Sequence, residues 1–163
     1  IKVRGHNLKL GRGGIREIEF FVQTQQLIAG GRNPKLRGRG TLAMLDQLAE
    51  AQWITPQAAD ELRSAYRFLR TIEHRGQMVN DEQTHSLPVD DAPFESLARF
   101  SGFESGEAFD AEIRRTLECV QGHYARLFES AEELGTESGS LVFTGGEDDP
   151  ETIETLSPGR ANF

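Results

Sequence analysis

Cysteine is nearly absent from this sequence, because Cys119 is the single one among 163 residues. One cysteine excludes a disulfide framework, and we expect it to exclude any cysteine-based metal site as well. A chain without disulfides is typical of a reducing compartment, so we expect a cytoplasmic protein. Long apolar runs are also missing. None approaches the ~18 residues of a membrane-spanning helix, which excludes a transmembrane protein of that class.

The given sequence opens on Ile1 rather than on methionine, and its first residues do not have the pattern of a signal peptide. We therefore expect it to be a segment of a longer protein. Its length fits one domain. With 27% charged and 37% hydrophobic residues and only 6 prolines, the composition is typical of a globular chain rather than a disordered one.

The net charge of −8 is distributed unevenly. Residues 1–40 contain nine Lys and Arg against two Glu, whereas residues 129–156 contain nine acids and no base. The basic front favours an anionic partner such as a phosphate, a nucleotide or a nucleic acid, although a solvated basic surface explains it equally well. The acidic end predicts a solvated tail or linker and disfavours nucleic acid.

Apolar residues recur with helical spacing through most of the chain. Glycine pairs, turn residues and caps divide this pattern into predicted helices at 15–29, 42–51, 56–80, 91–102 and 105–134, with one more short helix possible over 149–156. We expect an all-α fold, an antiparallel bundle of about four to five helices. The predicted organisation is a lead-in with a glycine-rich loop (1–14), the helical bundle (15–134) and an acidic linker or tail (135–163).

The glycine-rich segment before residue 15 is the most informative one. A glycine loop that leads into a helix start presents backbone N–H groups to an anion, and nearby cations would strengthen such a site. The candidates for contact with a nucleotide or phosphate are Lys9, Arg12, Gly13, Gly14 and Arg16. As a bare pattern, the segment is explained at least as well by a tight loop-to-helix junction.

A polar stripe runs along the helix that follows, formed by Arg16, Glu19, Gln23 and Gln26. Apolar residues flank this stripe on both sides, so we expect the helix to be largely buried and the stripe to need partners. Glu73 lies inside the apolar arc of helix 56–80 and needs a cation, for which Arg16 is the candidate. Glu19, Gln23 and Glu73 thus form an expected supporting network. The pair either is an ordinary structural ion pair or holds the loop against a neighbouring active site.

The sequence predicts no catalytic residue and no metal ligand in this chain. The spacing of the four histidines from one another and from the cysteine is interpreted as not that of metal ligands, and His123 is interpreted as a packing residue. The four are His6, His74, His85 and His123. No zinc-protease, serine-hydrolase or cysteine–histidine motif is present.

Four runs of residues resemble bacterial glutamine synthetase adenylyltransferases, the bifunctional enzymes that add AMP to glutamine synthetase and remove it. These runs are Leu8–Gln23, Gly30–Arg32, Tyr66–Arg75 and Asp81–Pro88. The likeness covers residues 4–134, in order and at the family's spacing. The Gly-Arg-Gly-Gly-Ile-Arg-Glu form at 11–17 resembles the N-terminal, deadenylylating half, and the tail at 141–150 resembles the connector toward the second half.

The resemblance implies a helical domain that follows a nucleotidyltransferase domain. The family's catalytic carboxylates, which hold Mg²⁺, would precede Ile1, so we expect this chain alone to be inactive and to need no cofactor, with Mg²⁺ and nucleotide bound elsewhere in the enzyme. The implied partners are glutamine synthetase, the PII signalling protein, the preceding nucleotidyltransferase domain and the second half of the enzyme. Two alternatives remain: the helical region of a PII uridylyltransferase, which the unbroken motif at 11–20 disfavours, and a basic helical module for nucleic acid.

Overall fold

Five α-helices and one short 3-10 turn make up the described part of the computed structural model, which comprises residues 1–31, 33–80 and 83–137. The helices are α1 (Ile15–Ala29), α2 (Thr41–Glu50), α3 (Pro56–Asn80), α4 (Asp91–Phe100) and α5 (Gly106–Glu137), and the turn η1 is Pro34–Arg37. The predicted all-α fold is confirmed. The short helix expected over 149–156 lies outside the described residues.

Local sequence signals determine where the helices begin. Thr55 precedes α3, and its Oγ1 accepts the N–H of Ala58 at 3.1 Å, while Pro56 occupies the first helical position. Ser105 plays the same part for α5, where its Oγ accepts the N–H of Ala108 at 3.2 Å. These caps satisfy backbone donors that have no partner within a helix.

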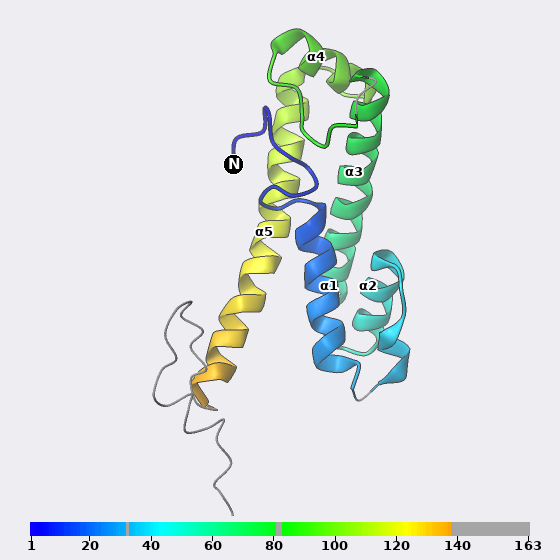
Figure 1. Cartoon of the computed structure of the whole chain (residues 1–163), viewed down its shortest axis with the longest axis vertical. Coiled ribbons are helices and arrows are strands. Elements are labelled where there is room, and N and C mark those ends of the chain that lie inside the picture. The colour runs from blue at the N-terminus through cyan, green and yellow to red at the C-terminus, as the bar shows by residue number, and fades with distance from the viewer. Residues whose placement is uncertain (32, 81–82, 138–163) are drawn as a thin grey trace, which may run out of the picture. The chain divides into compact units, whose positions relative to one another are not determined.

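The chain divides by its contacts into two units, Ile1–Leu127 and Phe128–Phe163, and the description that follows concerns the first. In this unit α3 runs in the direction opposite to α1 and to α5 (Figure 1). α2 packs on α1 and α3, and α4 packs on α3. The antiparallel bundle is therefore the observed arrangement, whereas the expected division at residue 135 stays a prediction.

The core is formed by apolar side chains from all five helices. Phe109 of α5 lies between Phe94 of α4 and Phe103, with ring centroids 5.2 Å from each. The lead-in belongs to the same core, because Val3 and Leu8 are each 1% exposed. Its backbone also pairs with the segment after α3.

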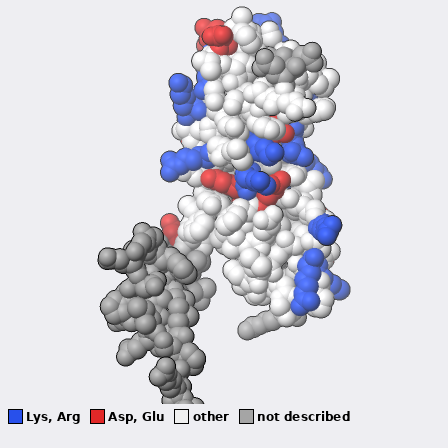
Figure 2. Space-filling view, in the orientation of Figure 1, with Lys and Arg blue, Asp and Glu red and all other residues white. Residues whose placement is uncertain are grey.

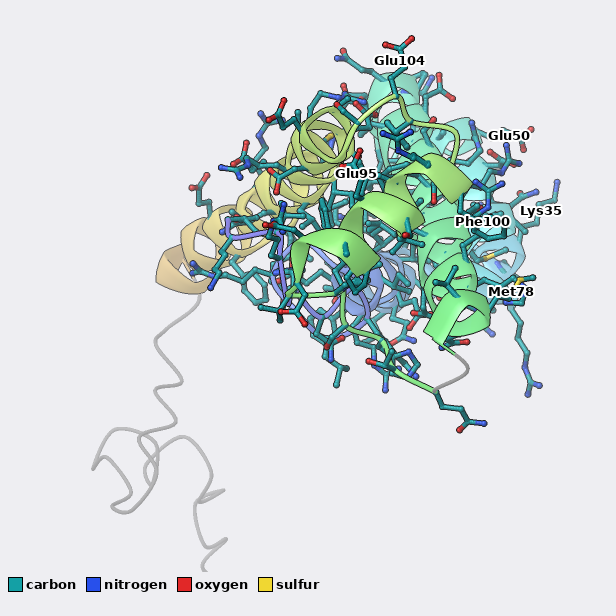
Figure 3. The ribbon with its side chains drawn as sticks, turned by 90° about the horizontal axis from the view of Figure 1, so that it is seen from above. Lys35, Glu50, Met78, Glu95, Phe100 and Glu104 are labelled. Atoms are coloured by element: carbon teal, nitrogen blue, oxygen red, sulfur yellow. The ribbon has the colours of Figure 1, made fainter. Side chains whose placement is uncertain are left out.

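Some large apolar side chains lie outside this core. Met78 and Phe100 lie at the periphery of the bundle in the view from above (Figure 3). Phe20 and Leu27 of α1 are 47% and 84% exposed, so the expectation that α1 is buried on both apolar flanks is wrong. Only one face of α1 packs into the core. Among the described residues, no helix is both long enough and apolar enough to cross a membrane.

Candidate functional site

The glycine-rich loop before α1 packs its backbone against α5 (Figure 1). Gly13 has φ +72°, a conformation that favours glycine. A Cβ on Gly13 would lie 2.1 Å from the carbonyl oxygen of Leu117, and one on Gly14 would lie 2.6 Å from the carbonyl oxygen of Leu8. Both glycines are therefore required by close approach of one backbone to another.

The backbone donors at the start of α1 are all used within the protein. The N–H groups of Gly14, Ile15 and Arg16 donate to the carbonyls of Gly11, Leu8 and Lys9 at 3.0, 2.9 and 2.9 Å. The Gly13 N–H donates to the carboxylate of Glu17 at 2.6 Å. The expectation of open N–H donors for an anion is therefore wrong at these positions. The loop carbonyls accept the first N–H groups of α1, which is the tight loop-to-helix junction that the sequence also allows.

The cationic side chains of the loop remain available. Arg12 is exposed and Lys9 is half-buried, and neither side chain makes an ion pair or hydrogen bond with a described residue. Arg16 contacts Glu19, with Nη1 and Oε2 3.5 Å apart. Gln23 is exposed. Figure 2 shows Lys and Arg side chains, with some acidic ones, in a band at the level of the loop. Lys9 and Arg12 can thus contact an anion through side chains alone.

Glu73 is buried, as predicted, with 9% of its side chain exposed, but Arg16 is not its partner. Its carboxylate lies 3.5 Å from Arg70, one turn earlier on α3, and 3.5 Å from the ring of His85. The predicted pair fails because α1 directs Arg16 toward solvent, where 63% of its side chain is exposed.

His85 links Glu73 to the loop. Its carbonyl accepts the N–H of Leu8 at 2.9 Å, and the neighbouring Ser86 forms a β-bridge with Asn7. The Asn7 side chain in turn accepts the N–H groups of Lys9 and Leu10 at 3.0 and 2.8 Å. Glu73 of α3 thus supports the loop that carries Lys9 through His85, and not through Arg16 as expected.

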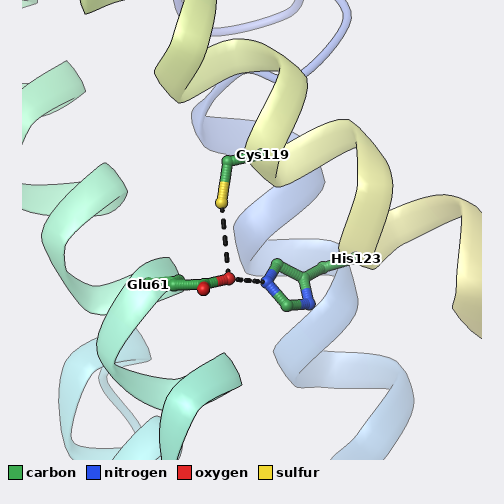
Figure 4. Close-up of side chains that lie close together, drawn as sticks. All are labelled: Glu61, Cys119 and His123. Atoms are coloured by element: carbon green, nitrogen blue, oxygen red, sulfur yellow. Dashed lines mark hydrogen bonds and ion pairs between the residues drawn. The ribbon is translucent and has the colours of Figure 1, made fainter.

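A second polar cluster joins α3 to α5 (Figure 4). The Nε2 of His123 donates to Oε2 of Glu61 at 2.6 Å, and Sγ of Cys119 lies 3.5 Å from the same oxygen. Hydrogen bonds from Gln57 and from His123 lower the pKa of Glu61. Burial, and then the charge of Glu61, raise the pKa of the Cys119 thiol. At neutral pH the cluster therefore holds a carboxylate and a protonated thiol.

The cluster adjoins a groove of about 430 Å³ between α3 and α5. Glu61 and Cys119 line it. The sequence interpretation missed this arrangement, although Cys119 and His123 stand four residues apart, which is one helical turn and a common ligand spacing. No sequence signal indicates Glu61, because it is 58 positions away and meets the pair only through packing.

Comparison with known proteins places the chain in a family. Residues 2–128 match the family model described as GlnD PII-uridylyltransferase. The chain belongs to this family. The match covers the lead-in, the glycine-rich loop and the helices of the first unit, so it includes the residues considered above.

The curated relatives with high identity to this chain carry a different name from that of the family model. The chain is 58% identical over 156 residues to a protein of Bartonella henselae, and 60% identical over 156 and 157 residues to proteins of Mesorhizobium japonicum and Brucella melitensis. Each is named bifunctional glutamine synthetase adenylyltransferase/adenylyl-removing enzyme. Each match covers 96% of this chain and 16% of the relative, so the chain spans about one sixth of their length.

Proposed function

We propose that this chain is a helical domain of an enzyme that removes AMP from glutamine synthetase and, in its other half, adds it. The observation that carries the proposal is identity of 58–60% over nearly the whole chain with proteins of that name. The motif at 11–17 supports assignment to the adenylyl-removing half.

The chain's own part in this reaction is support rather than chemistry. Phosphoryl transfer of this kind needs carboxylates that hold Mg²⁺ at the nucleotide. Within the described ranges, the single group of metal-binding side chains combines Glu61, Cys119 and His123, which is not a carboxylate set suited to Mg²⁺. We therefore assign Mg²⁺ and nucleotide to another domain of a longer enzyme.

The glycine-rich loop is the surface that we assign to that domain. Its backbone is fixed by α5 and by His85, so the loop presents Lys9 and Arg12 in a defined place without using them internally. Two cationic side chains that pair with no described residue suit a phosphate or adenylyl group. Because the N–H groups are already bonded, the contact is made by the side chains.

The implied partners follow from the same proposal. Glutamine synthetase is the substrate, the PII protein is the regulator, and the neighbouring domains of the enzyme contact the helical bundle. The reaction takes place in the cytoplasm.

The helical region of a PII uridylyltransferase is the second candidate, because the matching family model carries that description. The two functions are separated by substrate. A longer protein that contains this chain is expected to act on glutamine synthetase and to leave PII without UMP, whereas transfer of UMP to PII would favour the second candidate.

The isolated 163-residue chain tests the supporting role. With Mg²⁺ and phosphate it is expected to leave adenylylated glutamine synthetase unchanged while its circular dichroism is that of a helical bundle. Release of the adenylyl group by the folded chain at a rate above background would overturn this assignment.

A further inference from the structure

We propose that Glu61, Cys119 and His123 form a binding site for one divalent transition-metal ion of the zinc type. The three side chains come from two helices, and their ligand atoms all lie within 4.8 Å of one another (Figure 4). Neither the sequence pattern discussed above nor the names of the relatives assigns such a site.

The positions of the ligand atoms suit a single ion. Tetrahedral zinc with bonds of about 2.0–2.3 Å separates its ligand atoms by roughly 3.3–3.8 Å. Sγ of Cys119 and Oε2 of Glu61 are already 3.5 Å apart. Nε2 of His123 and Oε2 of Glu61 are 2.6 Å apart and need to separate by less than about 1 Å. The Glu61 side chain is 36% exposed, so it has room to rotate by this amount.

The chemistry of the donors selects the class of metal. One sulfur, one imidazole nitrogen and one carboxylate oxygen suit zinc, cobalt or nickel, whereas magnesium and calcium prefer oxygen alone. Three protein ligands leave a fourth tetrahedral position, which is the pattern of open zinc sites. The adjoining groove of about 430 Å³ gives water or a small ligand access to that position.

The surroundings support the ligands. Gln57 donates a hydrogen bond to Oε1 of Glu61 at 2.9 Å, which orients the carboxylate as an outer partner does in metal centres. Arg115 lies at the same groove, but its guanidinium is held by Glu112 at 2.6 and 3.1 Å. The charge of this nearby cation is therefore largely compensated.

The site would tie α3 to α5. Cys119 and His123 share one face of α5 at adjacent turns, and Glu61 is on the facing helix. An ion that binds only the folded chain stabilises it, so metal binding is expected to raise the melting temperature.

Cobalt and zinc titrations of the chelator-treated, reduced 163-residue chain test the proposal. We expect one Co²⁺ per chain with a near-ultraviolet thiolate-to-cobalt charge-transfer band, which zinc abolishes by displacement. A wild-type chain without this band overturns the proposal, and that result needs no variant.

Variants test each ligand. Cys119→Ala and His123→Ala are expected to weaken zinc binding by at least about a hundredfold, and Glu61→Gln by at least about tenfold. His74→Ala, which removes an exposed histidine of α3, is the matched control and is expected to bind as the wild type does. Equal zinc affinity of the wild type, Cys119→Ala and His123→Ala, with folding checked by circular dichroism, overturns the proposal.

Discussion

Glu73 of α3 faces the ring of His85, with Oε2 and Nδ1 3.5 Å apart. Both atoms are buried, and neither has a hydrogen-bond partner among the described residues. The carbonyl of the same His85 accepts the N–H of Leu8. One carboxylate of α3 thus contacts the residue whose carbonyl holds the glycine-rich loop.

Replacing Glu73 by alanine is expected to lower the free energy of unfolding by about 1–3 kcal/mol, because it removes a largely buried side chain together with its contacts to Arg70 and His85. Arg16→Ala is expected to change it by less than about 0.5 kcal/mol, since Arg16 is exposed and Glu19 is its one ion-pair partner among the described residues. Urea unfolding measures both. A loss of unfolding free energy for Arg16→Ala as large as that expected for Glu73→Ala would contradict this assignment of partners.

Gly13→Ala is expected to destabilise the chain by at least about 1–3 kcal/mol, because the residue has φ +72° and its Cβ would meet the carbonyl oxygen of Leu117. Gly122→Ala is the matched control. It lies on an exposed helical position with open space around the added Cβ, so it is expected to stabilise by about 0.5–1 kcal/mol. Thermal unfolding compares the two, and a neutral Gly13→Ala would refute the close packing of the loop on α5.

The lowered pKa of Glu112 predicts how the free energy of unfolding changes at acid pH. Hydrogen bonds from Arg115 lower the pKa of Glu112 below its ordinary value of 4.5. The folded chain then binds fewer protons than the unfolded chain, so this contribution is present above about pH 4.5 and is lost as the pH falls through the folded pKa. The Arg115 side chain is exposed and that of Glu112 is 36% exposed, which keeps the contribution below about 1 kcal/mol.

Stability measured by urea unfolding at several pH values checks this sign. Glu112→Gln is expected to fall less steeply than the wild type below about pH 4.5. Glu104→Gln serves as the control, since Glu104 is exposed at the surface and no ion pair involves it among the described residues (Figure 3). A steeper acid limb in Glu112→Gln than in the wild type would contradict the assignment.

Arg12→Ala, made in a longer enzyme that contains this chain, tests the loop's proposed contact. A charge-assisted contact worth roughly 1.5–3 kcal/mol predicts about a ten- to hundredfold loss of adenylyl removal. A contact made mainly in the transition state lowers kcat and kcat/KM equally. Arg39→Ala, which removes another exposed arginine among residues 1–40, is expected to leave both unchanged. Unchanged kinetics in Arg12→Ala would leave the loop as a helix junction only.

The helix boundaries could be predicted because local signals carry them. Glycines at 13–14 and 30–31 enclose α1, and Thr55 with Pro56 starts α3, in agreement with the structure. Burial of Glu73 was predictable for a similar reason, since its place in an apolar helical arc depends on spacing alone.

The sequence by itself therefore determined the all-α class and the approximate helix limits, both of which depend on near neighbours in the chain. Tertiary structure alone decided that the backbone at Gly13 packs on Leu117, that Glu73 faces His85 rather than Arg16, and that Glu61 joins Cys119 and His123. The physical reason is range: hydrogen bonds and ion pairs act over about 3 Å, so their partners are fixed by how helices pack and not by their spacing in the sequence.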